Sequence, residues 1–201
     1  ILDLEDAVAP ADKPAARAAL SASVAQLAIA DRARLLVRLN AVGSAWHDGD
    51  VATCTALVAQ GLGGVMPPKA ESAAQLAALA AALGPGAALL PLVESVAGLD
   101  ALDAIARAPQ VRRLAFGHLD FQADAGLACD ATEAELVPVR LALVLASRRA
   151  GLAAPVDGVT VDTRDTDRLQ ADAARALRGG FGGKLCIHPA QVAGVNAAFL
   201  P

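Results

Sequence analysis

Two carboxylates, Glu94 and Asp120, are the residues whose types and spacing most clearly predict chemistry. Glu94 stands in Leu92-Val-Glu-Ser and Asp120 in Phe116-Gly-His-Leu-Asp-Phe, each after a short apolar run. We expect these runs to be neighbouring strands about 4.8 Å apart, where two carboxylates repel each other unless a cation lies between them. Mg²⁺ suits this place, because it takes one or two carboxylates and leaves its other positions to water and substrate oxygens. Taken singly, Glu94 could as well be a helix N-cap, and Asp120 could lie in a solvated loop.

Arg38 lies inside an otherwise apolar run, Leu35-Leu-Val-Arg-Leu-Asn. A guanidinium cannot lose its charge, so it needs an anion, and a substrate carboxylate could accept both branches of its fork. The alternative is an internal salt bridge to Glu5 or Asp6. We give substrate binding more weight, because such a salt bridge would itself bring that carboxylate to the mouth of the same site.

The chain that must position these residues alternates short apolar runs with alanine-rich helical patterns. The predicted strands are bounded by Gly, Pro or polar residues, and they span Ile1–Val8, Leu35–Asn40, Gly64–Pro67, Ala88–Glu94, Arg113–Phe116, Gly158–Asp162 and Lys184–Ile187. The predicted helices span Pro14–Ile29, Asp50–Gln60, Ser72–Leu83, Val96–Ala106, Glu133–Ala150 and Thr166–Leu177. Strands this apolar on both faces indicate a parallel sheet covered by helices.

This alternation fits either a doubly wound sheet or an eight-stranded (β/α)8 TIM barrel. A nucleotide-binding doubly wound fold favours glycines after its first strand, and Leu4-Glu-Asp-Ala-Val has none. We therefore predict an α/β fold, a single TIM-barrel domain over residues 1–201. Because Ile1 begins inside a strand, and a closed barrel leaves no edges, we expect the missing first strand in a segment before it.

Catalytic groups of a barrel lie at the carboxyl ends of its strands. The polar residues predicted there are Asp3, Glu5, Asp6, Arg38, Asn40, Lys69, Glu94, His118, Asp120, Asp157, Asp162 and His188. Charged residues are seldom buried without partners, so a ring of carboxylates with an arginine predicts a site. The histidines lack metal-ligand spacing, and for His188 a structural role carries at least as much weight as catalysis.

The composition excludes several classes of protein. A net charge of −4 and an aromatic content of 2% argue against a nucleic-acid partner. The most apolar stretch, Gln75–Leu92, is interrupted by Gly84-Pro-Gly, so we predict no membrane-spanning helix. The three cysteines are far apart and without CxxC spacing, which is typical of reduced thiols in a cytoplasmic protein.

A series of motifs runs in order along the whole chain: Leu2-Asp-Leu-Glu-Asp-Ala-Val with Asp12-Lys and Arg17, Val37-Arg-Leu-Asn, Pro68-Lys-Ala-Glu, Leu92-Val-Glu-Ser, Phe116-Gly-His-Leu-Asp-Phe, Asp157-Gly-Val and Gly183-Lys-Leu-Cys-Ile-His-Pro. None suffices alone. Together they resemble the citrate lyase beta-subunit-like (HpcH/HpaI aldolase/citrate lyase) family, which includes malyl-CoA and citramalyl-CoA lyases.

The resemblance implies a Mg²⁺-dependent carbon–carbon lyase. Its substrate would be a citryl-, malyl- or citramalyl-thioester of CoA or of an acyl-carrier protein, cleaved by a retro-Claisen reaction that releases an enolate. By resemblance, Glu94 and Asp120 bind Mg²⁺ and act in catalysis with Arg38, while Glu5 and Asp6 hold metal-bound waters. We expect Arg38, Lys69 and Glu94 to contact the substrate.

Family members share a residue of the C-terminal tail between subunits, so we expect a homo-oligomer, a trimer or hexamer. This chain lacks that tail and also the substrate-binding arginine of the family's first strand. Two other functions stay open: a malyl-CoA-type thioesterase, in which water replaces the carbon–carbon chemistry, and a non-catalytic paralogue that acts as a binding or assembly subunit.

Overall fold

The structure is a computed structural model that describes residues 1–200. Eight short strands form two parallel four-stranded sheets, with the orders β1-β2-β3-β4 and β5-β6-β7-β8. Their bounds are β1 Leu2–Asp3, β2 Leu36–Arg38, β3 Gly64–Met66, β4 Ala88–Leu89, β5 Leu92–Val93, β6 Ala115–Phe116, β7 Val156–Asp157 and β8 Gly183–Lys184. The predicted α/β fold with parallel sheets is therefore confirmed.

The strands β4 and β5 are two parts of one predicted strand, which is interrupted at Pro91 because proline has no N–H to donate. On one side, Leu92 N–H donates to the Pro67 carbonyl at 2.9 Å, and on the other, Ala115 N–H donates to the Pro91 carbonyl at 2.9 Å. The two sheets are thus joined into one continuous arc.

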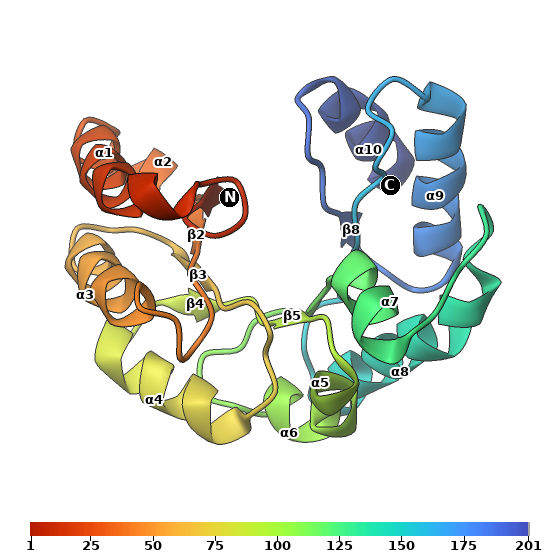
Figure 1. The fold of residues 1–201 in the computed structure, drawn as a ribbon, viewed down its shortest axis with the longest axis horizontal. Helices are drawn as coiled ribbons and strands as arrows, with labels where there is room; N and C mark the ends of the chain where they lie inside the picture. Colours follow the sequence, from red (N-terminus) through yellow and green to blue (C-terminus); the bar gives the residue numbers. More distant parts are fainter. Residues whose placement is uncertain (201) are drawn as a thin grey trace.

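Within residues 1–200, β1 and β8 each pair with a strand on one side only. Figure 1 shows the arc open between the red and blue ends of the chain, with α1 and α2 facing α9 and α10 across the opening. The described residues therefore form an open arc rather than a closed ring of strands, and the closed barrel stays a prediction.

Helices cover the outer side of the arc (Figure 1). Their bounds are η1 Pro10–Asp12, α1 Lys13–Ala25, α2 Ile29–Arg32, α3 His47–Val58, α4 Ala73–Leu83, α5 Val96–Asp100, α6 Leu102–Ala106, α7 His118–Ala125, η2 Ala134–Leu136, α8 Val137–Arg149, α9 Thr166–Arg178 and α10 Ala190–Phe199. None of the helices in residues 1–200 has both the length and the apolar character that a membrane crossing needs.

The alternation of side chains along the strands creates two apolar clusters. Val37, Val65 and Val93 belong to the large cluster, which also contains the buried residues of the covering helices. Their strand neighbours Met66 and Leu92 belong to a smaller cluster with Ala115 and Val156. Arg38 is the register partner of Met66, so the residues of this second face lie where a site can form.

Two predicted elements were wrong in detail, and one helix beside the site was not predicted. The strand expected at Gly158–Asp162 is β7 at Val156–Asp157, because the Asp162 carboxylate instead accepts the N–H of Arg164 in a turn. The predicted helix Val96–Ala106 is split at Ala101 into α5 and α6. The helix α7 was not predicted, because the polar His118 and Asp120 were read as the end of a strand.

Candidate active site

A cavity of about 570 Å³ opens at the carboxyl ends of the strands and is lined by residues of both sheets. It brings together Arg38, Glu94 and Asp120, as predicted, with Asp3 and Asp6. A larger groove of about 660 Å³ lies between α3 and α4, but no arginine is among its lining residues. The central cavity is therefore the candidate site.

Glu94 follows β5 and is 5% exposed. Its Oε1 accepts the backbone N–H of Lys69 at 2.8 Å. Gly117 lies so close that an added Cβ would be 2.4 Å from Glu94 Oε2, so this position needs a glycine. Ser95, and not Glu94, is the N-cap of α5, because its Oγ accepts the N–H of Gly98. The N-cap alternative for Glu94 is therefore wrong.

The pKa of Glu94 is raised to about 8, mainly by burial and also by the neighbouring Glu5 and Asp120, against the lowering effect of the Lys69 N–H and Arg38. The side chain thus has the environment of a carboxylate that lacks a counter-charge. Asp120 lies in the first turn of α7 and is exposed to the cavity. A carboxylate is favourable at this end of a helix, where the dipole is positive.

Arg38 pairs with three carboxylates. Its Nε donates to Asp3 Oδ1 at 2.8 Å and its Nη2 to Asp3 Oδ2, while its Nη1 lies 3.0 Å from Glu5 Oε2 and 3.2 Å from Asp6 Oδ2. The internal salt bridge considered as an alternative is therefore present, and a substrate role for Arg38 stays a prediction. Asp3 is its main partner, which the register explains, because the two residues lie opposite each other on β1 and β2.

This cluster shifts the pKa values of its members in opposite directions. Burial raises the pKa of Glu5 to about 7, and Arg38 opposes this while Asp6 and Asp3 add to it. Burial also acts to raise the pKa of Asp3, but the hydrogen bond and charge of Arg38 and the backbone N–H groups of Glu5 and Ala7 together outweigh it, and the net shift is downward. At the mouth of the cavity, the three carboxylates of Asp3, Glu5 and Asp6 thus outnumber the single positive charge of Arg38.

The Glu5–Asp6 loop is fixed by a buried lysine, Lys13, in the first turn of α1. Its Nζ donates to the carbonyls of Leu4 and Glu5, both at 2.9 Å, and to Asn40 Oδ1 at 2.6 Å. Asn40, predicted as a strand-end polar residue, is therefore structural. We call Lys13, Arg17, Asn40 and Asp50 the Lys13 network; in it Asp50 accepts from Asn40 and Arg17.

Lys69 contributes its backbone N–H to the central site, and its charge acts to lower the pKa of Glu5. The Lys69 φ of +45° is rare for a residue with a Cβ, and this conformation directs its N–H to Glu94. The residue also lines the groove between α3 and α4. Substrate contact by Lys69 stays a prediction.

The donor set fits Mg²⁺ better than a metal that needs many protein ligands. Residues 1–200 contain no group of three or more His, Cys, Asp or Glu side chains arranged to hold a metal ion. Mg²⁺ usually takes one or two carboxylates and keeps its waters. The buried Glu94 and the exposed Asp120, in one acidic cavity, match that preference.

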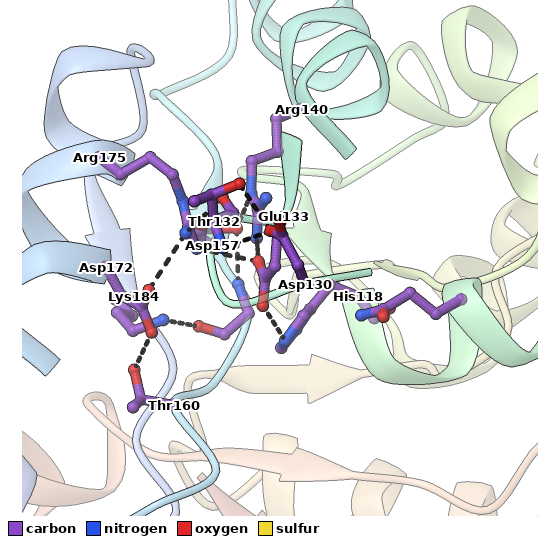
Figure 2. A network of polar contacts seen from close by, with 12 residues as sticks. His118, Asp130, Thr132, Glu133, Arg140, Asp157, Thr160, Asp172, Arg175 and Lys184 are labelled. Carbon is purple, nitrogen blue, oxygen red and sulfur yellow. Dashed lines mark hydrogen bonds and ion pairs between the residues drawn. The ribbon is translucent and has the colours of Figure 1, made fainter. Parts of the chain in front are cut away.

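A second polar cluster lies beside the cavity and was missed from the sequence (Figure 2). We call it the Glu133 network; its members are His118, Glu133, Arg140, Asp157, Arg168, Asp172 and Arg175. Glu133 accepts from Arg140 and, at 2.9 Å, from Arg175, and Asp157 pairs with Arg140 Nε at 3.0 Å. Burial acts to raise the pKa of Glu133, but contacts with His118 and Arg140 prevail and lower it to about 2.

The remaining predicted residues lie outside the central cavity. Asp157 is fully buried in the Glu133 network. Asp162 lies in an exposed turn. His188 is exposed, and its Nδ1 accepts the Ala190 N–H at the start of α10, which is the structural role considered for it.

The motifs of the chain match the HpcH/HpaI aldolase/citrate lyase family over residues 1–189. The chain belongs to this family. It is 34% identical to a citrate lyase subunit beta-like protein of Deinococcus radiodurans over 207 aligned residues, which cover all of this chain and 71% of the relative. It is 33% identical to a (3S)-malyl-CoA thioesterase of Cereibacter sphaeroides, 68% of which it covers. It is 31% identical to an L-malyl-CoA/beta-methylmalyl-CoA lyase of Rhodobacter capsulatus, 71% of which it covers.

Solved structures of the family share the fold. CitE of Mycobacterium tuberculosis in complex with magnesium and pyruvate is 36% identical, with a TM-score of 0.85 over all of this chain and 80% of that one. The same protein in complex with magnesium, acetoacetate and coenzyme A gives a TM-score of 0.83 and is covered to 72%. The HpcH/HpaI aldolase/citrate lyase family thus contains lyases and a thioesterase, and its solved members include proteins with bound magnesium.

Proposed function

We propose that this chain is a Mg²⁺-dependent carbon–carbon lyase that cleaves an acyl-thioester of the malyl, citramalyl or citryl type. One observation carries the proposal: the buried Glu94, the exposed Asp120 and Arg38 line one acidic cavity at the strand ends. The magnesium and coenzyme A bound to relatives support the same assignment.

The side chains would divide the work between binding and orientation. Glu94 and Asp120 would hold Mg²⁺, and Glu5 and Asp6 would fix its waters. The metal would supply positive charge for the oxyanion that develops during cleavage. The Lys69 N–H orients Glu94, and Lys13 orients the Glu5–Asp6 loop. Arg38, already aligned by Asp3, would contact the substrate carboxylate.

The apolar floor of the cavity supports a reaction that releases a reactive carbanion. Met66, Leu92 and Phe116 line the cavity, and each is less than 5% exposed. Such a floor would limit the access of water to the reacting carbon, while the polar rim would hold the carboxylate and the metal.

A thioesterase is the second candidate, because a relative that is 33% identical is a (3S)-malyl-CoA thioesterase. Incubation with malyl-CoA and Mg²⁺ separates the candidates by their products. Glyoxylate with acetyl-CoA indicates the lyase, and free malate with CoA indicates the thioesterase. If neither malyl-, citramalyl- nor citryl-thioester is consumed, the chain is a non-catalytic paralogue.

We further propose that the catalytic unit is a single closed (β/α)8 barrel, completed by one more strand between β1 and β8. The one-sided pairing of both strands supports this proposal. We also propose that the active form is a homo-oligomer, a trimer or hexamer. Light scattering at assay concentration tests the assembly, and a fully active monomer would contradict it.

A further inference from the structure

The first turn of α7, which carries Asp120, is held from behind by His118. This histidine is the first residue of the helix and is 3% exposed. On one side, a Cβ added to Gly158 would lie 2.0 Å from its Nδ1, so the ring rests against the end of β7. On the other side, its Nε2 lies 3.4 Å from Glu133 Oε1. The ring is therefore clamped between a glycine and a carboxylate.

Glu133, which precedes the short helix η2, is held by its backbone conformation and by several side-chain contacts. Its φ of +51° is in the left-handed region, which residues with a Cβ rarely adopt. It is 8% exposed, and it accepts hydrogen bonds from Arg140 and Arg175. Figure 2 shows these side chains around Glu133, with the His118 ring next to its carboxylate. A strained backbone is retained where the surrounding contacts require it, and here they direct the carboxylate toward His118.

Glu133 and the central site lie in different cavities. It lines a side cavity of about 360 Å³ and does not line the central cavity. His118, Leu119 and Val159 line both cavities and form the wall between them. Of these three wall residues, His118 is the one that Glu133 contacts.

We propose that Glu133 is a positioning residue, which acts through His118 to fix the first turn of α7 so that Asp120 faces Glu94 across the cavity. The inference rests on the proposed function, because it treats Asp120 as a ligand of Mg²⁺. It adds a residue outside the cavity to those that determine the affinity for the metal.

The test is a set of Mg²⁺ titrations by calorimetry on the whole chain. Glu133→Gln and His118→Leu should each weaken Mg²⁺ binding by about tenfold, the lower end for partners that orient metal ligands. Because both act through one contact, Glu133→Gln combined with His118→Leu should bind no more weakly than either alone. His118→Gln, which keeps an N–H donor in place of Nε2, should restore most of the affinity.

The matched control is Glu135→Gln, the same exchange at an exposed side chain two residues away, and it should bind as the wild type does. Losses that multiply in the double variant, or a His118→Gln variant as weak as His118→Leu, would overturn the inference. If Glu133→Gln does not fold, His118→Leu decides alone, and wild-type affinity in that variant overturns the inference. A wild-type chain that does not bind Mg²⁺ at all contradicts the proposed function, and the inference with it; binding that no variant changes contradicts the inference alone.

Discussion

The two buried polar networks beside the active site differ in how completely their atoms are paired. In the Lys13 network, one ammonium group meets three oxygen acceptors, and one amide joins Leu4 to Asp50. No buried side-chain nitrogen or oxygen of its four members lacks a partner. In the Glu133 network, Arg140 Nη1, Asp157 Oδ2 and Arg175 Nε are buried and have no hydrogen-bond partner among residues 1–200.

Donor geometry explains this difference for the two arginines. A guanidinium has five N–H groups in a fixed plane, whereas the three freely rotating donors of an ammonium group can each find an oxygen. Around Glu133, three arginines converge on one carboxylate, so some N–H groups point elsewhere. Buried water is the usual partner of such atoms. The Lys13 network is therefore a fixed brace for the Glu5 loop, and the Glu133 network depends on ion pairing.

The largest expected effect comes from Arg140→Met. It would leave the fully buried Asp157 without its charged partner, which typically destabilises a protein by about 3–5 kcal/mol. Urea unfolding at neutral pH measures the loss. Arg149→Met is the matched control on the same helix: its ion pair with Asp103 is about half exposed, and it should cost less than about 1 kcal/mol. Equal losses of unfolding free energy in the two variants would show that the buried ion pair of Arg140 contributes no more to stability than the exposed ion pair of Arg149.

Lys13→Met should cost about 2–3 kcal/mol, because it removes the donor to two backbone carbonyls and to Asn40. Lys184→Met is the matched exchange on the other side of the molecule. There the ammonium donates to the Gly158 carbonyl alone, and burial lowers its pKa, so the loss should be about 1 kcal/mol or less. Thermal unfolding of both variants compares them, and a larger loss at Lys184 would reverse the proposed roles.

The Glu133 network should also weaken in acid. The pKa of Glu133 falls from 4.5 to about 2 in the folded chain, so its stabilising effect is complete above about pH 4.5 and is lost as the pH falls toward 2. The difference in unfolding free energy between wild type and Glu133→Gln should therefore shrink over that range, by on the order of 2 kcal/mol. Urea unfolding from pH 6 to pH 2 measures it, with Glu135→Gln as the control for loss of a charge. A difference that does not change with pH would contradict the ion-pairing account.

The smallest expected effect is at Trp46, above whose ring the Lys13 Nζ lies at 4.9 Å. Trp46→Leu should lose about 1 kcal/mol, the scale of a partly shielded cation–π contact. The loss should be smaller in a Lys13→Met background, because the cation is then absent. Circular dichroism during urea unfolding measures all three variants, and equal losses in both backgrounds would assign the effect to packing alone.

The sequence predicted most of the strand positions and the central site, because both follow from local patterns. Apolar runs bounded by breakers located β2, β3, β5 and β6, and the carboxyl ends of β2, β5 and β6 brought Arg38, Glu94 and Asp120 into one cavity. The sequence left open which carboxylate pairs with Arg38, because only the register of β1 against β2 places Asp3 opposite Arg38.

The Glu133 network could not be predicted in the same way. Its members come from α7, the segment before η2, α8, β7 and α9, and no spacing along the chain relates Glu133 to Arg175 or His118 to Gly158. Contacts of this range appear only once the helices are packed. His118 and Asp157 were expected as strand-end polar residues, but not as partners of one cluster; a further local signal was Arg140, a charged residue among the Val and Leu residues of a helix.

The central claim, that Glu94 and Asp120 hold Mg²⁺ in the cavity at the strand ends, is tested most directly by calorimetric titration of Mg²⁺ into the wild type and into a variant with Glu94→Ala and Asp120→Ala. The account predicts saturable binding to the wild type and none to the double variant, with the circular dichroism spectrum of the fold retained. Unchanged Mg²⁺ affinity in the double variant would contradict it.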